Sequence, residues 1–134
     1  MKYLLDSNTC IAYLRGKNPH TLKRIVSCPH SDLVMCSVVL GELYYGAERS
    51  SHPIQECAKV TAFVSQFISL PFDDLAAREF GRVRADLAIR GCQIGPSDTM
   101  IAAIALVHGL IVVTHNKKEF GRVTGLTIED WELP

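Results

Sequence analysis

Short, continuously apolar segments of strand length recur along the chain and alternate with longer segments of helical periodicity. Leu33–Cys36 and residues 110–113 are apolar at every position, as expected for strands that are covered on both faces of a sheet. Such strands alternating with helices predict an α/β fold with a mainly parallel central sheet of about five strands. The remaining strands are predicted near residues 2–6, 67–72 and 126–128.

Residues that favour helix starts follow each apolar segment. Serine, asparagine and aspartate are good N-caps, and proline is favoured in the first helical turn. Helices are therefore predicted to start at Ser7 or Asn8, Pro19, Ser37, Pro53, Asp73 or Asp74, Pro96 and near Lys117. The longest is predicted to end at Gly91, and the next at His108-Gly109.

The length of the chain, 134 residues, suits one domain, and 48% of the residues are hydrophobic. We find no repeat or linker, so residues 1–134 are predicted to form a single domain. No apolar run reaches the roughly 18 residues that are needed to cross a bilayer. No interaction with a membrane is therefore expected.

The chain has five cysteines, an odd number with scattered spacing and no C-x-x-C pair. This pattern argues against a disulfide framework and against a structural zinc site. Cys10 and Cys36 lie in apolar segments and are predicted to be buried thiols. A reducing compartment, the cytoplasm, is expected.

Four carboxylates follow or flank the predicted strands: Asp6, Glu42, Asp98 and Glu119. In open parallel sheets, ligands bind beyond the carboxyl ends of the strands, so these side chains are expected to share one edge. Clustered carboxylates repel one another unless a cation lies between them, and Mg²⁺ or Mn²⁺ prefers such oxygen ligands. The sequence thus predicts either a site for Mg²⁺ or Mn²⁺ or a group of carboxylates with shifted pKa values.

Each acid also has a structural alternative. Asp6 is a possible helix N-cap, and Glu42 a possible member of a solvated helix face. Asp98 follows Pro96 and Ser97 in a first helical turn, where the helix dipole is expected to favour an ionised carboxylate. Glu119 fits a surface turn that is anchored by its neighbour.

Four segments together resemble the PIN domain, and most closely the VapC toxins of bacterial VapBC toxin–antitoxin pairs. The segments are Leu4-Leu5-Asp6-Ser7-Asn8, Ser37-x-x-x-x-Glu42-Leu43-x-x-Gly46, Gly95-Pro96-Ser97-Asp98-x-x-Ile101-Ala102-Ala103 and Val113-Thr114-x-Asn116-x-x-Glu119-Phe120. The ending Leu126-x-x-Glu129-Asp130-Trp131 is similar to the enterobacterial type. The resemblance covers essentially the whole chain, and it implies a three-layer fold with helices flanking the sheet.

The resemblance implies an endoribonuclease that depends on Mg²⁺ or Mn²⁺ and acts as the toxin of a type II toxin–antitoxin system. Asp6, Glu42, Asp98 and Glu119 match the catalytic and metal-binding acids, while Ser7, Thr114 and Asn116 match supporting polar positions. Structured RNA is the implied substrate, often tRNA cut in the anticodon region, with initiator tRNA favoured among enterobacterial relatives. Many PIN domains carry aspartate at the fourth acidic position, where this chain has Glu119, and the enterobacterial type tolerates glutamate there.

The resemblance also implies several partners. A VapB-type antitoxin is expected to wrap the toxin and block its acidic pocket. A homodimer and a toxin–antitoxin hetero-oligomer are expected, with operator DNA bound only through the antitoxin.

The formal net charge is zero, so an RNA-binding chain must separate acids in a pocket from bases on its rim. Candidate RNA-binding residues are Arg15, Lys17, Lys117 and Lys118.

Three other functions remain open from the sequence. Asp6-Ser7-Asn8-Thr9 is similar to the nucleophile loop of aspartate-based phosphotransferases, although Asn8 cannot act as their general acid. A phosphoacceptor signalling domain shares the length and the α/β alternation, but it needs paired acids after the first strand. A PIN-type module that binds RNA or an antitoxin without catalysis is the third alternative.

Overall fold

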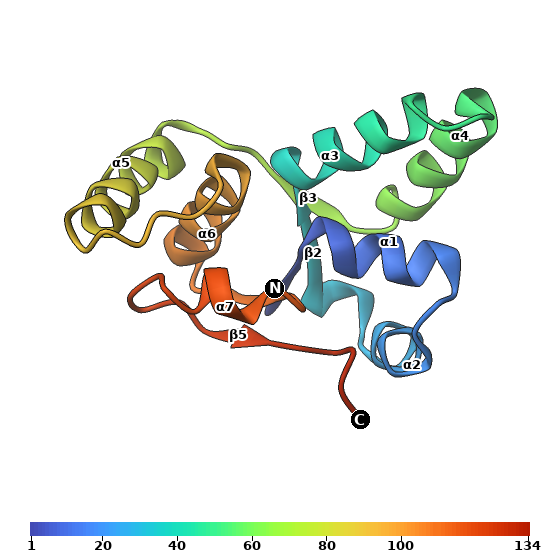
Figure 1. Cartoon of the computed structure of the whole chain (residues 1–134). Helices are drawn as coiled ribbons and strands as arrows, with labels where there is room; N and C mark the ends of the chain where they lie inside the picture. The colour runs from blue at the N-terminus through green and yellow to red at the C-terminus, as the bar shows by residue number, and fades with distance from the viewer.

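The computed structural model describes residues 1–134 and shows an α/β fold around one five-stranded parallel sheet (Figure 1). The strands are β1 (Tyr3–Leu5), β2 (Leu33–Cys36), β3 (Ile68–Leu70), β4 (Ile111–Val113) and β5 (Ile128–Glu129). Their order across the sheet is β3-β2-β1-β4-β5, and every neighbouring pair is parallel. The predicted fold class is therefore confirmed.

Strand β1 lies at the centre of the sheet and determines the register on both sides. Leu4 aligns with Val34 of β2 and with Val112 of β4. These three side chains are fully buried, because helices cover both faces of the sheet. Continuous burial explains why the central strands are apolar at every position.

Seven α-helices connect the strands, together with a short 3-10 turn at His30–Asp32. The helices are α1 (Ser7–Arg15), α2 (Pro19–Ser27), α3 (Ser37–Glu48), α4 (Pro53–Val64), α5 (Asp74–Ile89), α6 (Pro96–His108) and α7 (Lys117–Phe120). Figure 1 shows α1 to α4 on one side of the sheet, and α5 and α6 on the other. The predicted three layers are present.

Several element boundaries differ from the sequence prediction. Asp6, rather than Ser7 or Asn8, caps α1, because its carboxylate reaches the backbone N–H of Thr9 at 2.8 Å. Ser37 is already helical, and Cys36 precedes α3 without a side-chain cap.

The third strand is shorter than predicted, and the last strand starts later than predicted. Strand ends depend on pairing with a neighbour, which hydropathy alone does not reveal.

A single cluster of 29 buried hydrophobic residues forms the core. Helix α6 contributes Ile101, Ala102, Ile104 and Ala105, each at most 1% exposed, so it is the most deeply buried helix. Trp131 and Phe120 are the largest fully buried side chains. No helix has the length and apolar character required to span a membrane.

All five cysteines are free thiols, and Cys10 and Cys36 are buried as predicted. Burial, the largest influence, raises the pKa of the Cys36 thiol to about 11. These two thiols therefore act as small apolar side chains in the core.

We expect Ile104→Ala to lower the free energy of unfolding by about 2–5 kcal/mol, because it removes buried methyl groups and leaves a cavity. Ile89→Ala is the matched control, since Ile89 is 86% exposed and its truncation should change stability by less than about 0.5 kcal/mol. Urea denaturation followed by circular dichroism measures both. Equal effects for the two variants would contradict the assigned core.

Candidate active site

The strand order reverses between β1 and β4, which is the point at which open parallel sheets bind ligands. Asp6 directly follows β1, and its backbone N–H donates to the Val113 carbonyl of β4 at 3.1 Å. Thr114 directly follows β4. The adjacent strands therefore deliver both residues to the same edge of the sheet.

Asp6 is held rigidly and is only 4% exposed. One carboxylate oxygen accepts from Thr9, whose hydroxyl donates to the Val113 carbonyl at 3.1 Å. Burial raises the pKa of Asp6, and hydrogen bonds from the Thr114 and Thr9 side chains offset part of that rise. The nearby charge of Glu42 raises the Asp6 pKa further.

Asp98 lies in the first turn of α6, close enough to the other three acids for their charges to act on its pKa. Burial, followed by the charges of Asp6, Glu42 and Glu119, raises the pKa of Asp98 to about 6. The helix dipole favours the ionised carboxylate at this position, as expected from the sequence, but the net shift of the Asp98 pKa is upward. Desolvation and like-charge repulsion outweigh the dipole, which is worth only about 1 kcal/mol.

Glu42 lies on α3, and its Oε1 accepts a hydrogen bond from the Ser7 hydroxyl of α1 at 2.5 Å. This contact joins two helices that are 35 residues apart in sequence. Ser7 was predicted as a supporting residue, and it orients one oxygen of Glu42. Glu42 is partly buried and thus does not lie on a fully solvated helix face.

Asn116 precedes α7 but does not cap it with its side chain. Its amide instead donates to Asp98 Oδ2 at 3.3 Å, and its backbone N–H donates to the Thr114 hydroxyl at 2.9 Å. Glu119 lies in the single turn of α7, from where its charge acts on Asp98. The structure therefore brings together all four acids and all three supporting residues that were predicted from the sequence.

The donor set fits a divalent cation. Carboxylate oxygens are the preferred ligands of hard cations, and a cation would remove the repulsion that raises the pKa values of Asp6 and Asp98. No three ligand atoms of these acids lie within 4.8 Å of one another.

The residues of the phosphotransferase alternative do not form a loop. Ser7, Asn8 and Thr9 are the first turn of α1, and Asn8 is exposed. Asp6 alone of these four residues is an acid at the strand end. The structure therefore offers no second acid for that chemistry beside Asp6 in its own loop.

Comparisons with known proteins agree with this geometry. Residues 3–126 match the PIN domain. A "tRNA(fMet)-specific endonuclease VapC" of Salmonella typhimurium is 43% identical over 131 residues, which are 98% of each chain. The chain belongs to the VapC ribonucleases of the PIN-domain family. PIN-domain nucleases use a divalent metal ion, as the carboxylate set predicts.

Other VapC relatives have the same extent and fold. A "Ribonuclease VapC2" of Haemophilus influenzae is 36% identical, and the match covers 98% of each chain. A crystal structure of DNA-bound VapBC from Salmonella typhimurium superposes with a TM-score of 0.92 at 43% identity, covering 98% of each chain. A VapBC2 structure from Rickettsia felis reaches a TM-score of 0.88 at 28% identity.

The candidate RNA-binding residues lie in different surroundings. Arg15 and Lys17 line a groove of about 640 Å³ between α1, α3 and α4, which also includes Glu42. Lys117 lies 3.8 Å from Asp130, whereas Lys118 is exposed and forms no ion pair. All four bases are exposed at the surface, and their role in binding RNA stays a prediction.

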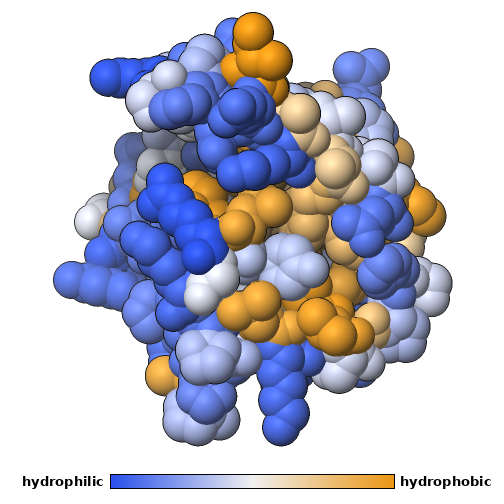
Figure 2. Space-filling model, turned by 90° about the vertical axis from the view of Figure 1, so that its right-hand side faces the viewer, coloured by the Kyte–Doolittle hydropathy of each residue, from blue (hydrophilic) through white to orange (hydrophobic).

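Apolar side chains form part of the lining of this groove. They include Ile11, Leu14, Leu43 and Val60, beside polar and charged residues. The face drawn in Figure 2, which corresponds to the right-hand side of Figure 1, shows apolar side chains across its middle with hydrophilic side chains around them.

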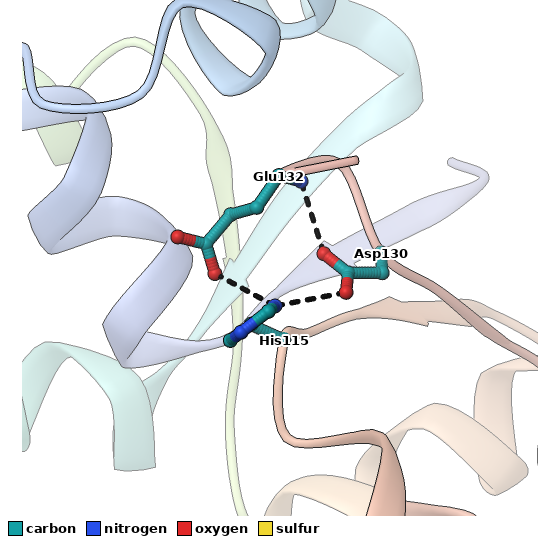
Figure 3. Close-up of side chains that lie close together, drawn as sticks. All are labelled: His115, Asp130 and Glu132. Atoms are coloured by element: carbon teal, nitrogen blue, oxygen red, sulfur yellow. Dashed lines mark hydrogen bonds and ion pairs between the residues drawn. The ribbon is translucent and has the colours of Figure 1, made fainter. Parts of the chain in front are cut away.

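Two features of the site were missed at the level of sequence. Thr9 fixes Asp6 and ties α1 to β4, but a threonine in a helical segment carries no distinct signal. His115 pairs with Asp130 and Glu132 (Figure 3). Fifteen residues separate His115 from Asp130, and no spacing rule predicts that contact.

The raised pKa of Asp98 has a consequence for stability. An acid whose pKa is raised by folding stabilises the fold below its unfolded pKa, near 3.8, and loses this contribution as pH rises through about 6. Without metal at pH 7.5, we therefore expect Asp98→Asn to raise the free energy of unfolding. The gain should be about 1 kcal/mol after allowance for solvent screening of this partly buried group.

Thermal or urea denaturation at pH 7.5 and pH 4 in EDTA measures this effect. The gain should shrink at pH 4, and Asp74→Asn, on the exposed first turn of α5, should show no gain. An equal gain for Asp98→Asn at both pH values would show that charge repulsion is not its cause.

Proposed function

We propose that Asp6, Glu42, Asp98 and Glu119 hold Mg²⁺ or Mn²⁺ and that this ion enables the chain to cleave RNA as an endoribonuclease toxin. The observation that carries the proposal is the partly buried Asp98, whose pKa is raised to about 6 by burial and by the other three acids. Such an arrangement is unfavourable without a cation. Membership of the VapC ribonucleases supports the same function.

Each residue of the site has a different proposed role in hydrolysis. A bound divalent ion lowers the pKa of a water molecule and neutralises charge that develops on the phosphate. Asp6 and Asp98 provide oxygens whose positions are fixed by Thr9 and Asn116. Glu42 is oriented through Oε1 by Ser7, which leaves Oε2 free to bind the ion or to accept the proton of the attacking water.

We propose structured RNA as the substrate, with tRNA cut in its anticodon region as the first candidate. The name of the Salmonella relative specifies tRNA(fMet), which makes initiator tRNA the leading choice. Side chains select RNA mainly through shape and exposed loop bases, because the deep major groove of A-form helices is inaccessible to them. Arg15, Lys17, Lys117 and Lys118 are proposed to contact phosphates at the rim.

We further propose that a VapB-type antitoxin binds this chain in a type II toxin–antitoxin system. The groove between α1, α3 and α4 is lined by apolar and charged side chains, among them Glu42, so an amphipathic segment bound in it would contact one acid of the site. The related solved structures are VapBC assemblies, some with DNA. We propose a homodimer, and operator DNA bound only through the antitoxin.

Residues 1–134 are proposed to act as one PIN domain, because a single sheet and a single core cluster include elements from both ends of the chain. Five free thiols support a cytoplasmic site of action.

A PIN-type module that binds RNA or antitoxin without cleaving is the alternative, and it makes a different prediction in the experiment below. Membership of the VapC ribonucleases argues against the phosphotransferase and phosphoacceptor alternatives.

Purified, antitoxin-free protein is expected to cut tRNA in Mg²⁺ or Mn²⁺ and to lose that activity in EDTA. Asp98→Asn keeps the shape and the contact with Asn116 but removes a charged ligand, so the rate should fall by at least about 100-fold. Gel analysis of total tRNA, followed by sequencing of the cut species, measures both the activity and the cleavage position. Asp74→Asn is the matched control and should cut at the normal rate.

The chemistry of the product ends tests the route. Attack by water yields a 5′-phosphate and a 3′-hydroxyl, whereas a 2′,3′-cyclic phosphate would mean that the RNA's own 2′-hydroxyl attacks. Absence of metal-dependent cleavage in a folded preparation would favour the non-catalytic alternative.

Binding of uncleaved RNA should depend on the rim bases. In an Asp98→Asn background, Arg15→Ala and Lys118→Ala should each weaken binding and reduce the slope of log affinity against log salt by about 1. Lys117→Ala should have a smaller effect, because its ammonium lies beside Asp130. Arg78→Ala, on the exposed surface of α5, is the control. An equal loss of RNA affinity in that variant would contradict the proposed role of Arg15 and Lys118 in RNA binding.

A further inference from the structure

A second charged cluster lies beside the carboxylate site. The His115 Nδ1 lies 2.9 Å from Asp130 Oδ2 and 3.1 Å from Glu132 Oε2 (Figure 3). The side chain of Asp130 is only 2% exposed, and Lys117 Nζ lies 3.8 Å from it. Asp130, followed by Glu132, raises the pKa of His115, which favours the charged imidazolium.

The charges of this cluster balance without a metal ion. Two carboxylates, Asp130 and Glu132, face one imidazolium and the ammonium of Lys117. A divalent cation would have to displace the proton of His115 and lie close to Lys117, which repels it. The cluster is therefore better explained as an ion-paired contact between two segments of the chain than as a metal site.

One of these segments, residues 129–132, is the C-terminal strap, and it is firmly anchored. The Thr21 hydroxyl of α2 donates to the Trp131 carbonyl at 3.2 Å, and the Asn18 amide donates to the Glu132 carbonyl at 3.3 Å. Trp131 is buried and packs edge-on against Tyr3 of β1, with ring centroids 4.9 Å apart. The strap thus provides a fixed support that does not depend on His115.

The other segment is the turn at residues 114–116, which connects β4 to α7. The side chains on either side of His115 act on the carboxylate site: Asn116 donates to Asp98, and Thr114 lowers the pKa of Asp6 through a hydrogen bond. His115 itself contacts none of the four acids and reaches the strap instead. The strap therefore binds His115, the middle residue of this turn. Its two neighbours, Thr114 and Asn116, belong to the carboxylate site.

We propose that His115 is a positioning residue for RNA cleavage, whose contact with Asp130 and Glu132 of the C-terminal strap holds the 114–116 turn so that Asn116 meets Asp98. The proposal rests on the proposed function of the carboxylate site. Loss of this contact allows the turn to shift, and a displacement of about 1 Å in a catalytic site costs about 100-fold in rate. Because the rim bases still hold the RNA, the loss falls on kcat and not on KM.

The test compares His115→Ala with His115→Asn in tRNA cleavage by wild-type and variant proteins. The amide nitrogen of asparagine occupies nearly the place of the imidazole Nδ1 and can donate to Asp130, whereas alanine cannot. We expect His115→Ala to lower kcat by about 10- to 100-fold with KM within about 3-fold, and His115→Asn to restore most of kcat. His20→Ala is the matched control, because His20 is exposed on α2 and its ring has no hydrogen bond or ion pair.

A second readout is independent of activity. Hydrogen exchange of the Asn116 backbone N–H, which donates to Thr114, should be faster in His115→Ala than in wild type and near normal in His115→Asn. This measurement tests the positioning role even if the wild-type protein cleaves no RNA, which would contradict the proposed function alone. Thermal melting of each variant shows whether it is folded.

Three outcomes would overturn the proposal. Equal loss of kcat in His115→Ala and His115→Asn would mean that the exposed ring acts on RNA directly. A change confined to KM would assign His115 to substrate binding. Normal cleavage and normal Asn116 exchange in folded His115→Ala would reduce the cluster to a surface contact.

Discussion

The properties of this site follow from one constraint, the unfavourable free energy of placing several carboxylates close together at one edge of a parallel sheet. Asp6 is buried at the point where the strand order reverses, and Asp98 faces it from α6. Burial and mutual repulsion raise the pKa values of both groups, so the ligand-free site is electrostatically unfavourable. A divalent cation would relieve this repulsion, so the proposed metal-assisted hydrolysis would use the same feature that costs stability.

The fold compensates for part of this cost with neutral hydrogen bonds. Asp6 caps α1 and accepts from the Thr9 N–H, so a residue of the site also satisfies a free helix end. Asn116 occupies the corresponding position at α7 but directs its amide to Asp98 and leaves that helix without a side-chain cap. The usual capping role of asparagine at a helix N-terminus is thus replaced by a contact with Asp98. Such departures from local preference are common at functional positions.

A chain of zero net charge would need separated acids and bases to bind RNA as proposed. Asp6 and Asp98 are buried or partly buried near the sheet edge, whereas the proposed RNA-binding residues Arg15 and Lys118 are exposed at the surface. The groove lined by Glu42, whose lining is apolar in part, is the proposed binding surface of the antitoxin. Substrate and antitoxin would therefore compete for adjoining surfaces, which links inhibition to the geometry of the fold.

The sequence by itself determined the α/β class, most helix starts and the four acids, because strand-length apolar runs, prolines and carboxylates at strand ends are local signals. It also led to the family, through the order of four weak motifs. Only the tertiary structure decided that Asp98 has a raised pKa, since repulsion depends on distances between acids from different elements. The contact between Asp130 and His115 was likewise decided only by the tertiary structure, because no periodicity in the sequence relates the turn after β4 to the C-terminal residues.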